Sequence, residues 1–188
     1  MKARRVKGLD AAMPLADAAE RIVAVRAAEL CDLAAQSQDP AAVRELHDTR
    51  IAAKRLRYVL EITAQCFGEY AETATKRAKD VQDLLGEVHD CDEMLPKLDQ
   101  LRWRTRERDA AYLVGAAGRG SGPPNADAYR GLERLAVELT ARRARLFHDW
   151  LELWRDLQRK GFRARLEHAV GERPVTERAP SLDGAGTV

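Results

Sequence analysis

The stretch from Glu45 to Leu60 (ELHDTRIAAKRLRYVL) constrains the fold most, because as a helix it divides into an apolar side and a cationic side. At 100° per residue, one histidine and three basic residues, spaced by three, four and three, fall within an arc of about 80°. These residues are His47, Arg50, Lys54 and Arg57. Apolar residues occupy roughly the opposite side, namely Leu46, Ala52, Ala53, Leu56, Val59 and Leu60. Such a helix must bury one side against other helices, which predicts a helical bundle.

The cationic side of this stretch is typical either of a solvated surface or of an anion-binding site. A helix face meant only for solubility usually mixes charges of both signs. Here the carboxylates of Glu45, Asp48 and Glu61 stay at the ends and leave the centre basic. Arginine donors match phosphate or carboxylate oxygens, and histidine adds a donor whose charge changes near neutral pH. We therefore expect this side to contact an anion.

The composition predicts an all-α fold. Hydrophobic residues make up 45% of the chain, charged residues 33% and aromatic residues only 5%, which suits a helical bundle better than a β-protein. A length of 188 residues allows one well-buried domain but not two large ones. The net charge of +2 is small for a general nucleic-acid binder, so an anion site must depend on local clustering of cations.

Apolar periodicity and helix-breaking residues predict an antiparallel four-helix-type bundle with long helices and a basic face, over residues 14–170. The expected helices cover residues 14–36, 39–67 and 70–89, a fourth helix that begins at Asp90 or Asp92, and residues 126–160 with a short extension after Gly161. Residues 1–13 form a basic leader, residues 115–125 a flexible loop rich in glycine and proline, and residues 171–188 a disordered tail.

The helix expected at residues 70–89 carries a second polar side opposite its apolar residues. Its members repeat the spacing of three, four and three, with Lys76 nearby; they are Lys79, Gln82, Gly86 and His89. Glycine in a helix costs roughly 1 kcal/mol relative to alanine. Gly86 therefore either lets two helices pack closely or leaves room for a ligand, and the sequence leaves both interpretations open.

Two other groups of residues are candidates for a site. His89, Asp90 and Asp92 could suggest a metal centre, but the chain has no Glu-x-x-His pair of the di-iron type and no HExxH, so we expect a helix cap and no metal or cofactor. Arg142 and Arg145 lie on the exposed flank of the last long helix and could face the same anion as the cationic side.

The cysteines and the absence of long apolar runs bear on location. Cys31, Cys66 and Cys91 are odd in number and widely spaced, which is typical of reduced thiols. No apolar run follows the basic N-terminus, and no segment approaches the roughly 20 apolar residues of a membrane span. We expect a cytoplasmic protein that does not enter a membrane.

Two motifs together resemble the CHAD family, the conserved histidine α-helical domain. They are LHDTRIAAKRLRYVLE and KRAKDVQDLLGEVHDCDEM, and a looser similarity in RARLFHDWLELWRDLQRKGFRARL extends the resemblance over most of residues 14–168. The resemblance implies an all-helical protein that binds inorganic polyphosphate on a basic surface, in some members at polyphosphate granules. The basic positions of the family then fall on His47, Arg50, Lys54, Arg55, Arg57, Lys76, Lys79 and His89.

The family usually has two copies of its helical unit, related by a pseudo-twofold axis, whereas each signature occurs once in this chain and resembles the second unit. The chain is then either a shortened form with one basic face or one half of a C2 dimer. Three residues beside the cationic side, Ile51, Tyr58 and Ile62, favour the homodimer.

These features lead to one main functional hypothesis, the non-catalytic binding of inorganic polyphosphate. The alternative is a scaffold or regulatory helical module that binds an acidic protein or nucleic acid. A phosphohydrolase is less expected, because the chain has neither a P-loop nor the Glu-x-Glu-x-Lys signature of triphosphate hydrolysis. Scarce aromatic residues and the low net charge argue against specific recognition of nucleic acid.

Overall fold

The computed structural model describes residues 2–115 and 122–172, which form five α-helices and one short 3₁₀ helix and contain no β-strand. The helices are α1 (Leu15–Gln36), α2 (Val43–Thr63), η1 (Ala64–Cys66), α3 (Tyr70–Gly115), α4 (Ala126–Arg159) and α5 (Phe162–Gly171). The predicted all-α fold is confirmed. The disordered tail and the centre of the flexible loop that we expected from the sequence lie outside the described residues, at 173–188 and 116–121.

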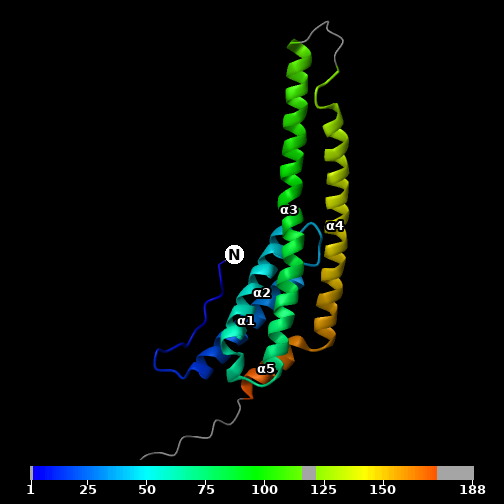
Figure 1. Cartoon of the computed structure of the whole chain (residues 1–188). Helices are drawn as coiled ribbons and strands as arrows, with labels where there is room; N and C mark the ends of the chain where they lie inside the picture. The colour runs from blue at the N-terminus through cyan, green and yellow to red at the C-terminus, as the bar shows by residue number, and fades with distance from the viewer. Residues whose placement is uncertain (1, 116–121, 173–188) are drawn as a thin grey trace, which may run out of the picture.

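The helices form a bundle from which one hairpin projects (Figure 1). α2 packs against α1 and α3, α4 packs along α3, and α5 contacts α1, α3 and α4 at the lower end. The upper parts of α3 and α4 continue beyond α1 and α2 as an antiparallel pair. We call this pair, residues 98–115 and 126–140, the stalk. Within the described residues, its two helices pack against each other.

The core lies where α1, α2 and the lower part of α3 meet, and it is closed by the end of α4 and by α5. The apolar side predicted for the second helix is buried, except that Val59 is only partly covered. Trp150 of α4 is fully buried, and its Nε1 donates a hydrogen bond to the backbone oxygen of Ser37 at 3.0 Å. This bond joins α4 to the end of α1, so the tryptophan packs in the core and does not offer a stacking surface.

The prediction of a separate fourth helix beginning at Asp90 or Asp92 is wrong, because α3 continues from Tyr70 to Gly115 with Pro96 inside it. Asp92 does not act as a cap. Its carboxylate pairs with Arg143 of α4, and both side chains are largely buried, with 12% and 14% exposed. Arg143 also donates to the backbone oxygen of Pro40 at 2.8 Å. These contacts hold this part of α3 against α4, so packing overrides the local capping signal.

The second helix begins later than predicted. Asp39 Oδ1 accepts a hydrogen bond from the backbone N–H of Ala41 at 2.8 Å, and Ala42 N–H donates to the backbone oxygen of Asp39 at 3.1 Å. Asp39 therefore caps a single turn, and α2 begins only at Val43. The glycine expected to end this helix, Gly68, follows the short helix η1.

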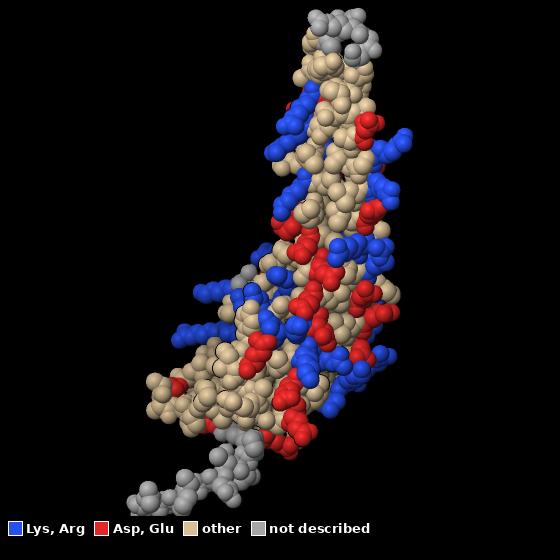
Figure 2. Space-filling model, in the orientation of Figure 1, with Lys and Arg blue, Asp and Glu red and all other residues tan. Residues whose placement is uncertain are grey.

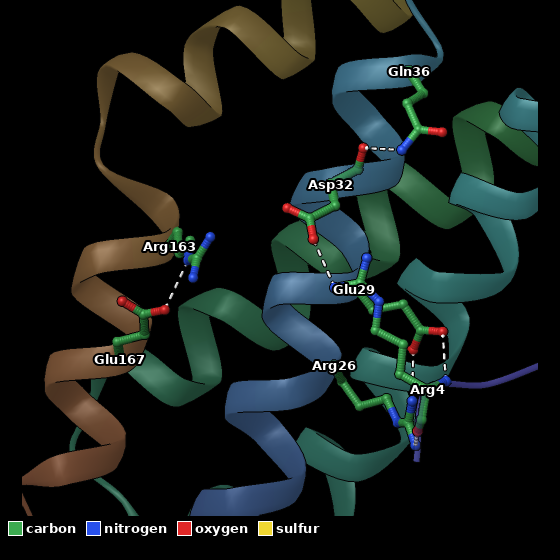
Figure 3. A network of polar contacts seen from close by, with 7 residues as sticks. All are labelled: Arg4, Arg26, Glu29, Asp32, Gln36, Arg163 and Glu167. Atoms are coloured by element: carbon green, nitrogen blue, oxygen red, sulfur yellow. Dashed lines mark hydrogen bonds and ion pairs between the residues drawn. The ribbon is translucent and has the colours of Figure 1, made fainter. Parts of the chain in front are cut away.

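The basic leader docks on α1 through a buried carboxylate (Figure 3). Glu29 is only 1% exposed and accepts hydrogen bonds from the backbone N–H of Arg4 at 3.1 Å and from Arg26 at 2.6 Å. Arg4 also pairs with Asp32 at 2.6 Å. From α2, Arg55 Nη1 lies 3.4 Å from Glu29 Oε1. Glu29 therefore connects the leader, α1 and α2.

The structure also bears on the expectations about thiols and membranes. Cys31, Cys66 and Cys91 are free, and burial raises the pKa of the Cys31 thiol to about 11. Among the helices of the described ranges, none combines the length and the apolar character that crossing a membrane requires.

The variant Glu29→Gln tests whether the buried carboxylate of Glu29 connects the leader, α1 and α2. We expect Glu29→Gln to lower the free energy of unfolding by about 3–5 kcal/mol, because removal of a buried carboxylate leaves arginines without their counter-charge. The control is Glu167→Gln, whose partner Arg163 is half exposed. Loss of such a surface pair changes stability by at most about 1 kcal/mol. Urea unfolding gives both values, and equal values would show that Glu29 contributes no more than a surface carboxylate.

Candidate functional site

The antiparallel packing of α2 on α3 brings their two polar sides together. His47 lies against His89, with ring centroids 4.7 Å apart. One turn further along α2, Arg50 lies beside Gly86, which precedes His89 on α3. Residues later in α2 therefore lie beside residues earlier in α3. The two matching spacings predicted from the sequence therefore face each other along one line. We call this line the seam; it consists of His47, Arg50, Lys54, Arg57, Lys79, Gln82, Gly86 and His89.

Two nitrogen atoms near the His47–His89 end of the seam are buried without a hydrogen-bond partner among the described residues. They are Nδ1 of His47 and Nε of Arg50. A buried polar group left unsatisfied costs roughly 1–3 kcal/mol. The Arg50 Nε–H is a donor, and Nδ1 of His47 becomes one when the imidazole is protonated. An anionic oxygen within hydrogen-bond distance of either atom would satisfy that atom.

Gly86 leaves space beside Arg50. A Cβ atom added at Gly86 would meet Arg50 Nε at 3.6 Å, which is an ordinary van der Waals distance, and no backbone atom of α2 within 4 Å. Close packing of the two helices therefore does not require glycine at this position. The space beside Arg50 therefore accommodates one methyl group in ordinary contact with the buried Nε.

The surroundings of His47 favour its neutral form. Burial has the largest effect and lowers its pKa below the usual 6.5, and the nearby His89 and Arg50 lower it further. The carboxylate of Asp48 acts in the opposite direction and has a smaller effect. A bound anion would add negative charge next to the ring and would favour the protonated form. The charge of the seam therefore depends on what it contacts.

The cations further along α2 are held by specific contacts. Arg57 Nε donates to Gln82 Oε1 of α3 at 3.0 Å, and Arg57 Nη1 lies 2.6 Å from Glu61 Oε1. The Arg57 guanidinium lies over the ring of Tyr58, 4.4 Å from its centre, and the Lys54 ammonium lies 5.6 Å from the same centre. These contacts align both cations with the seam. They also give a role to Tyr58, which the sequence suggested as a dimer contact.

The lysines of α3 lie on its exposed side, next to carboxylates. Lys79 is 61% exposed and lies 3.8 Å from Asp83, and Lys76 is exposed one turn earlier. Figure 2 shows Lys and Arg side chains spread along the visible face from the stalk to the bundle, with acidic side chains between them. The carboxylate of Asp83 reduces the attraction of Lys79 for an anion.

Besides Lys76, which lies one turn before Lys79 on the exposed side of α3, three of the candidate cations do not join the seam. Arg55 contacts the buried Glu29 of α1, as described above. Arg142 Nη2 lies 2.8 Å from Glu87 Oε2, and Arg145 lines a surface hollow formed only by residues 142–149 of α4. α4 packs against α3 and not closely against α2. The structure therefore places Arg142 and Arg145 outside the line on which α2 meets α3.

Arg143 was not among the residues predicted from the sequence, although it joins α3, α4 and the loop before α2. Its position was informative, because Leu139, Arg143, Leu146 and Trp150 follow one another at spacings of four, three and four. A cation inside an apolar stripe needs a buried counter-charge. The stripe could therefore have indicated that Arg143 is paired, and Asp92 is that partner.

The residues considered for a metal centre separate in the structure. His89 faces His47, and Asp92 pairs with Arg143. Across residues 2–115 and 122–172, no group of three or more His, Cys, Asp or Glu side chains is arranged to hold a metal ion.

Substitution of Gly86 distinguishes open space from close packing. We expect Gly86→Ala to raise the free energy of unfolding by about 1 kcal/mol, because alanine favours the helix and its methyl group fits beside Arg50. Chemical denaturation measures the change. A matched control is Gly131→Ala in α4, where an added Cβ meets no atom within 4 Å and should stabilise similarly. Destabilisation by Gly86→Ala alone would indicate close packing at Gly86.

Comparison with known families identifies the part of the chain that contains the seam. The CHAD domain model matches residues 2–99, more than half of the chain, and this match includes the leader, α1, α2 and the lower part of α3. The looser similarity noted in α4 lies beyond the matched residues. No curated protein and no solved structure matches the chain. All eight seam residues fall within the match, and the chain belongs to the CHAD family.

Proposed function

We propose that the seam binds inorganic polyphosphate, a linear polyanion, and leaves it chemically unchanged. The observation that carries this proposal is the pair of unsatisfied nitrogen atoms, His47 Nδ1 and Arg50 Nε, buried in the part of the seam where His47 meets His89. Membership of the CHAD family, which is linked to polyphosphate binding, supports the choice of ligand. Phosphate oxygens are acceptors that both groups can use.

The line of cations suits an extended ligand better than a single ion. From His47 to Arg57 the axis of α2 rises by about 15 Å at 1.5 Å per residue. Several phosphate groups of one chain can therefore contact His47, Arg50, Lys54 and Arg57 at the same time. Each contact is weak and exchangeable, but contacts made by one chain add through high effective concentration. Long polymers are then bound more tightly than short ones.

The carboxylates close to the seam support a binding role without catalysis. Phosphoryl transfer requires a positioned nucleophile and stabilisation of the transferred group, usually with metal ions held by carboxylates. Glu61 is paired with Arg57, and Asp83 lies next to Lys79. Both carboxylates therefore have partners of their own. The remaining seam residues supply hydrogen-bond donors and positive charge, which hold a polyanion in place.

Removal of the central cations tests the site. For Arg50→Ala/Lys54→Ala/Arg57→Ala we expect at least about a tenfold loss of affinity for long-chain polyphosphate, because charge-assisted hydrogen bonds contribute about 1.5–3 kcal/mol each. The dependence of log K on log salt should also become shallower by about two to three, since fewer counterions are released. Titrations at several salt concentrations, with RNA of equal charge as competitor, measure both quantities. The length of the polyphosphate chains is measured again after incubation with the protein.

The control variant is Arg134→Ala/Arg155→Ala/Arg159→Ala, which removes the same charge from exposed positions of α4. It should bind nearly as well as the parent protein. Equal affinity of the seam variant and this control would contradict the proposed site. RNA that competes as well as polyphosphate would favour the module for nucleic acid or acidic proteins, and shortened polymer would contradict a non-catalytic role.

The pH dependence of binding tests the part played by His47. In the free protein the pKa of His47 lies below 6.5, and a bound polyanion raises it. Between these two pKa values binding takes up a proton, so affinity should rise as pH falls from about 8 to about 6. The groups that face His47 are Asp48 and Arg50 on α2 and His89 on α3. His47→Gln should flatten the profile, and a flat profile in the parent protein would exclude this role.

A further inference from the structure

A second group of cations lies on the stalk, away from the seam. A surface hollow of about 410 Å³ lies between α3 and α4 and is lined by Arg102, Arg106, Tyr129, Arg130 and Glu133. Its three guanidinium groups come from both helices, and Glu133 is the one carboxylate in the lining. Three positive charges against one negative charge leave the lining with a net charge of +2. The stalk therefore concentrates positive charge in a concave surface.

The charges of this hollow are incompletely paired within the described part of the chain. Arg102 contacts both Asp99, at 3.1 Å, and Glu133. Glu133 is thus already engaged, and neither Arg106 nor Arg130 has a carboxylate partner among the described residues. Arg102 and Arg106 are four residues apart on one helix, where like charges destabilise by about 0.2–0.5 kcal/mol. An anion in the hollow would turn this repulsion into attraction.

The wall of the hollow is fixed independently of any ligand. Tyr129 donates a hydrogen bond to Asp109 Oδ2 at 2.6 Å, and Asp109 is only 3% exposed. Oδ1 of the same carboxylate accepts hydrogen bonds from Asn125 Nδ2 at 2.6 Å and from the Asn125 backbone N–H at 3.3 Å. This cluster joins the start of α4 to α3. The ring of Tyr129 is therefore positioned before binding, which reduces the entropy lost when a ligand binds.

We propose that this hollow is a second binding site, specific for a phosphoryl group. Arg106 and Arg130, which have no carboxylate partner among the described residues, match the two charges of a phosphate dianion, and each guanidinium can donate two hydrogen bonds to phosphate oxygens. The hollow is larger than one phosphate group, so the group can belong to an inorganic oligophosphate or to a nucleotide. From Gly86 to Arg106 the axis of α3 rises by about 30 Å. The stalk site is therefore separate from the seam and does not depend on what the seam binds.

The test uses NMR of the ¹⁵N-labelled full chain, titrated separately with tripolyphosphate and with ATP. We expect saturable shifts of the backbone amides of residues 102–106 and 129–133. Arg106→Gln/Arg130→Gln should reduce the affinity measured at these amides at least tenfold, and Arg130→Gln alone should give an intermediate loss. Without ligand, the backbone amides near Asp109 and Asn125 should have the same chemical shifts in the variants as in the parent protein, which shows that the hairpin is intact. Unchanged affinity in the double variant would overturn the proposal.

Two further variants separate this site from other effects. Arg134→Gln/Arg155→Gln removes two cations of α4 that do not line the hollow, and it should leave the stalk shifts unchanged. The seam variant lacking Arg50, Lys54 and Arg57 should also retain them, whether or not the seam binds polyphosphate. Loss of the stalk shifts in either variant would contradict a separate site. Similar affinity for tripolyphosphate and ATP would support phosphoryl recognition, and a response to ATP alone would exclude it.

Discussion

The antiparallel packing of α2 on α3 is the contact on which the site depends. Small side chains make up much of the core where α1, α2 and α3 meet, and Ala27, Ala52, Ala53, Ala74 and Ala78 are all fully buried. The separation of packed helices depends on the size of the side chains between them, so alanine allows close approach. Close approach draws the polar edges of α2 and α3 toward each other. His47 and Arg50 consequently lose water at Nδ1 and Nε without gaining a protein acceptor.

The sequence predicted those elements whose signals are local and repeated. Apolar periodicity located α1 and α4 to within one residue at each end, because α1 buries a stripe along its length and α4 buries the lower part of its stripe, from Phe147 to Leu157. The prediction of a separate fourth helix was wrong because a contact between residues far apart in the sequence overrides the local signal. Aspartate at positions 90 and 92 is a local capping signal, but the carboxylate of Asp92 is used by Arg143, 51 residues later in the chain. A local pattern cannot reveal a contact made by another helix.

The candidate site was predictable in part, for a related reason. The spacings of three, four and three identified which residues share one side of each helix, and His47 meets His89 as matching spacings in antiparallel helices allow. The spacing does not fix which neighbour lies beside each remaining cation. Arg55 contacts Glu29 on α1, and Arg142 contacts Glu87 on α3. Both carboxylates were visible in the sequence, but their pairing depends on how the helices pack.

Cations of this chain are available to bind an anion where no carboxylate of the chain lies within contact distance of them. With 32 basic and 30 acidic residues, most cations can find a counter-charge, and such surface pairs contribute little to stability. At the seam, packing buries Arg50 Nε where no acceptor of the described chain reaches it. On the stalk, Arg106 and Arg130 line a hollow whose one carboxylate already contacts Arg102. In the seam, burial removes water from Arg50 Nε, and in the stalk hollow, Arg102 and Arg106 repel each other. Both effects favour binding of an anion, so a nearly neutral chain can offer two distinct surfaces to anions.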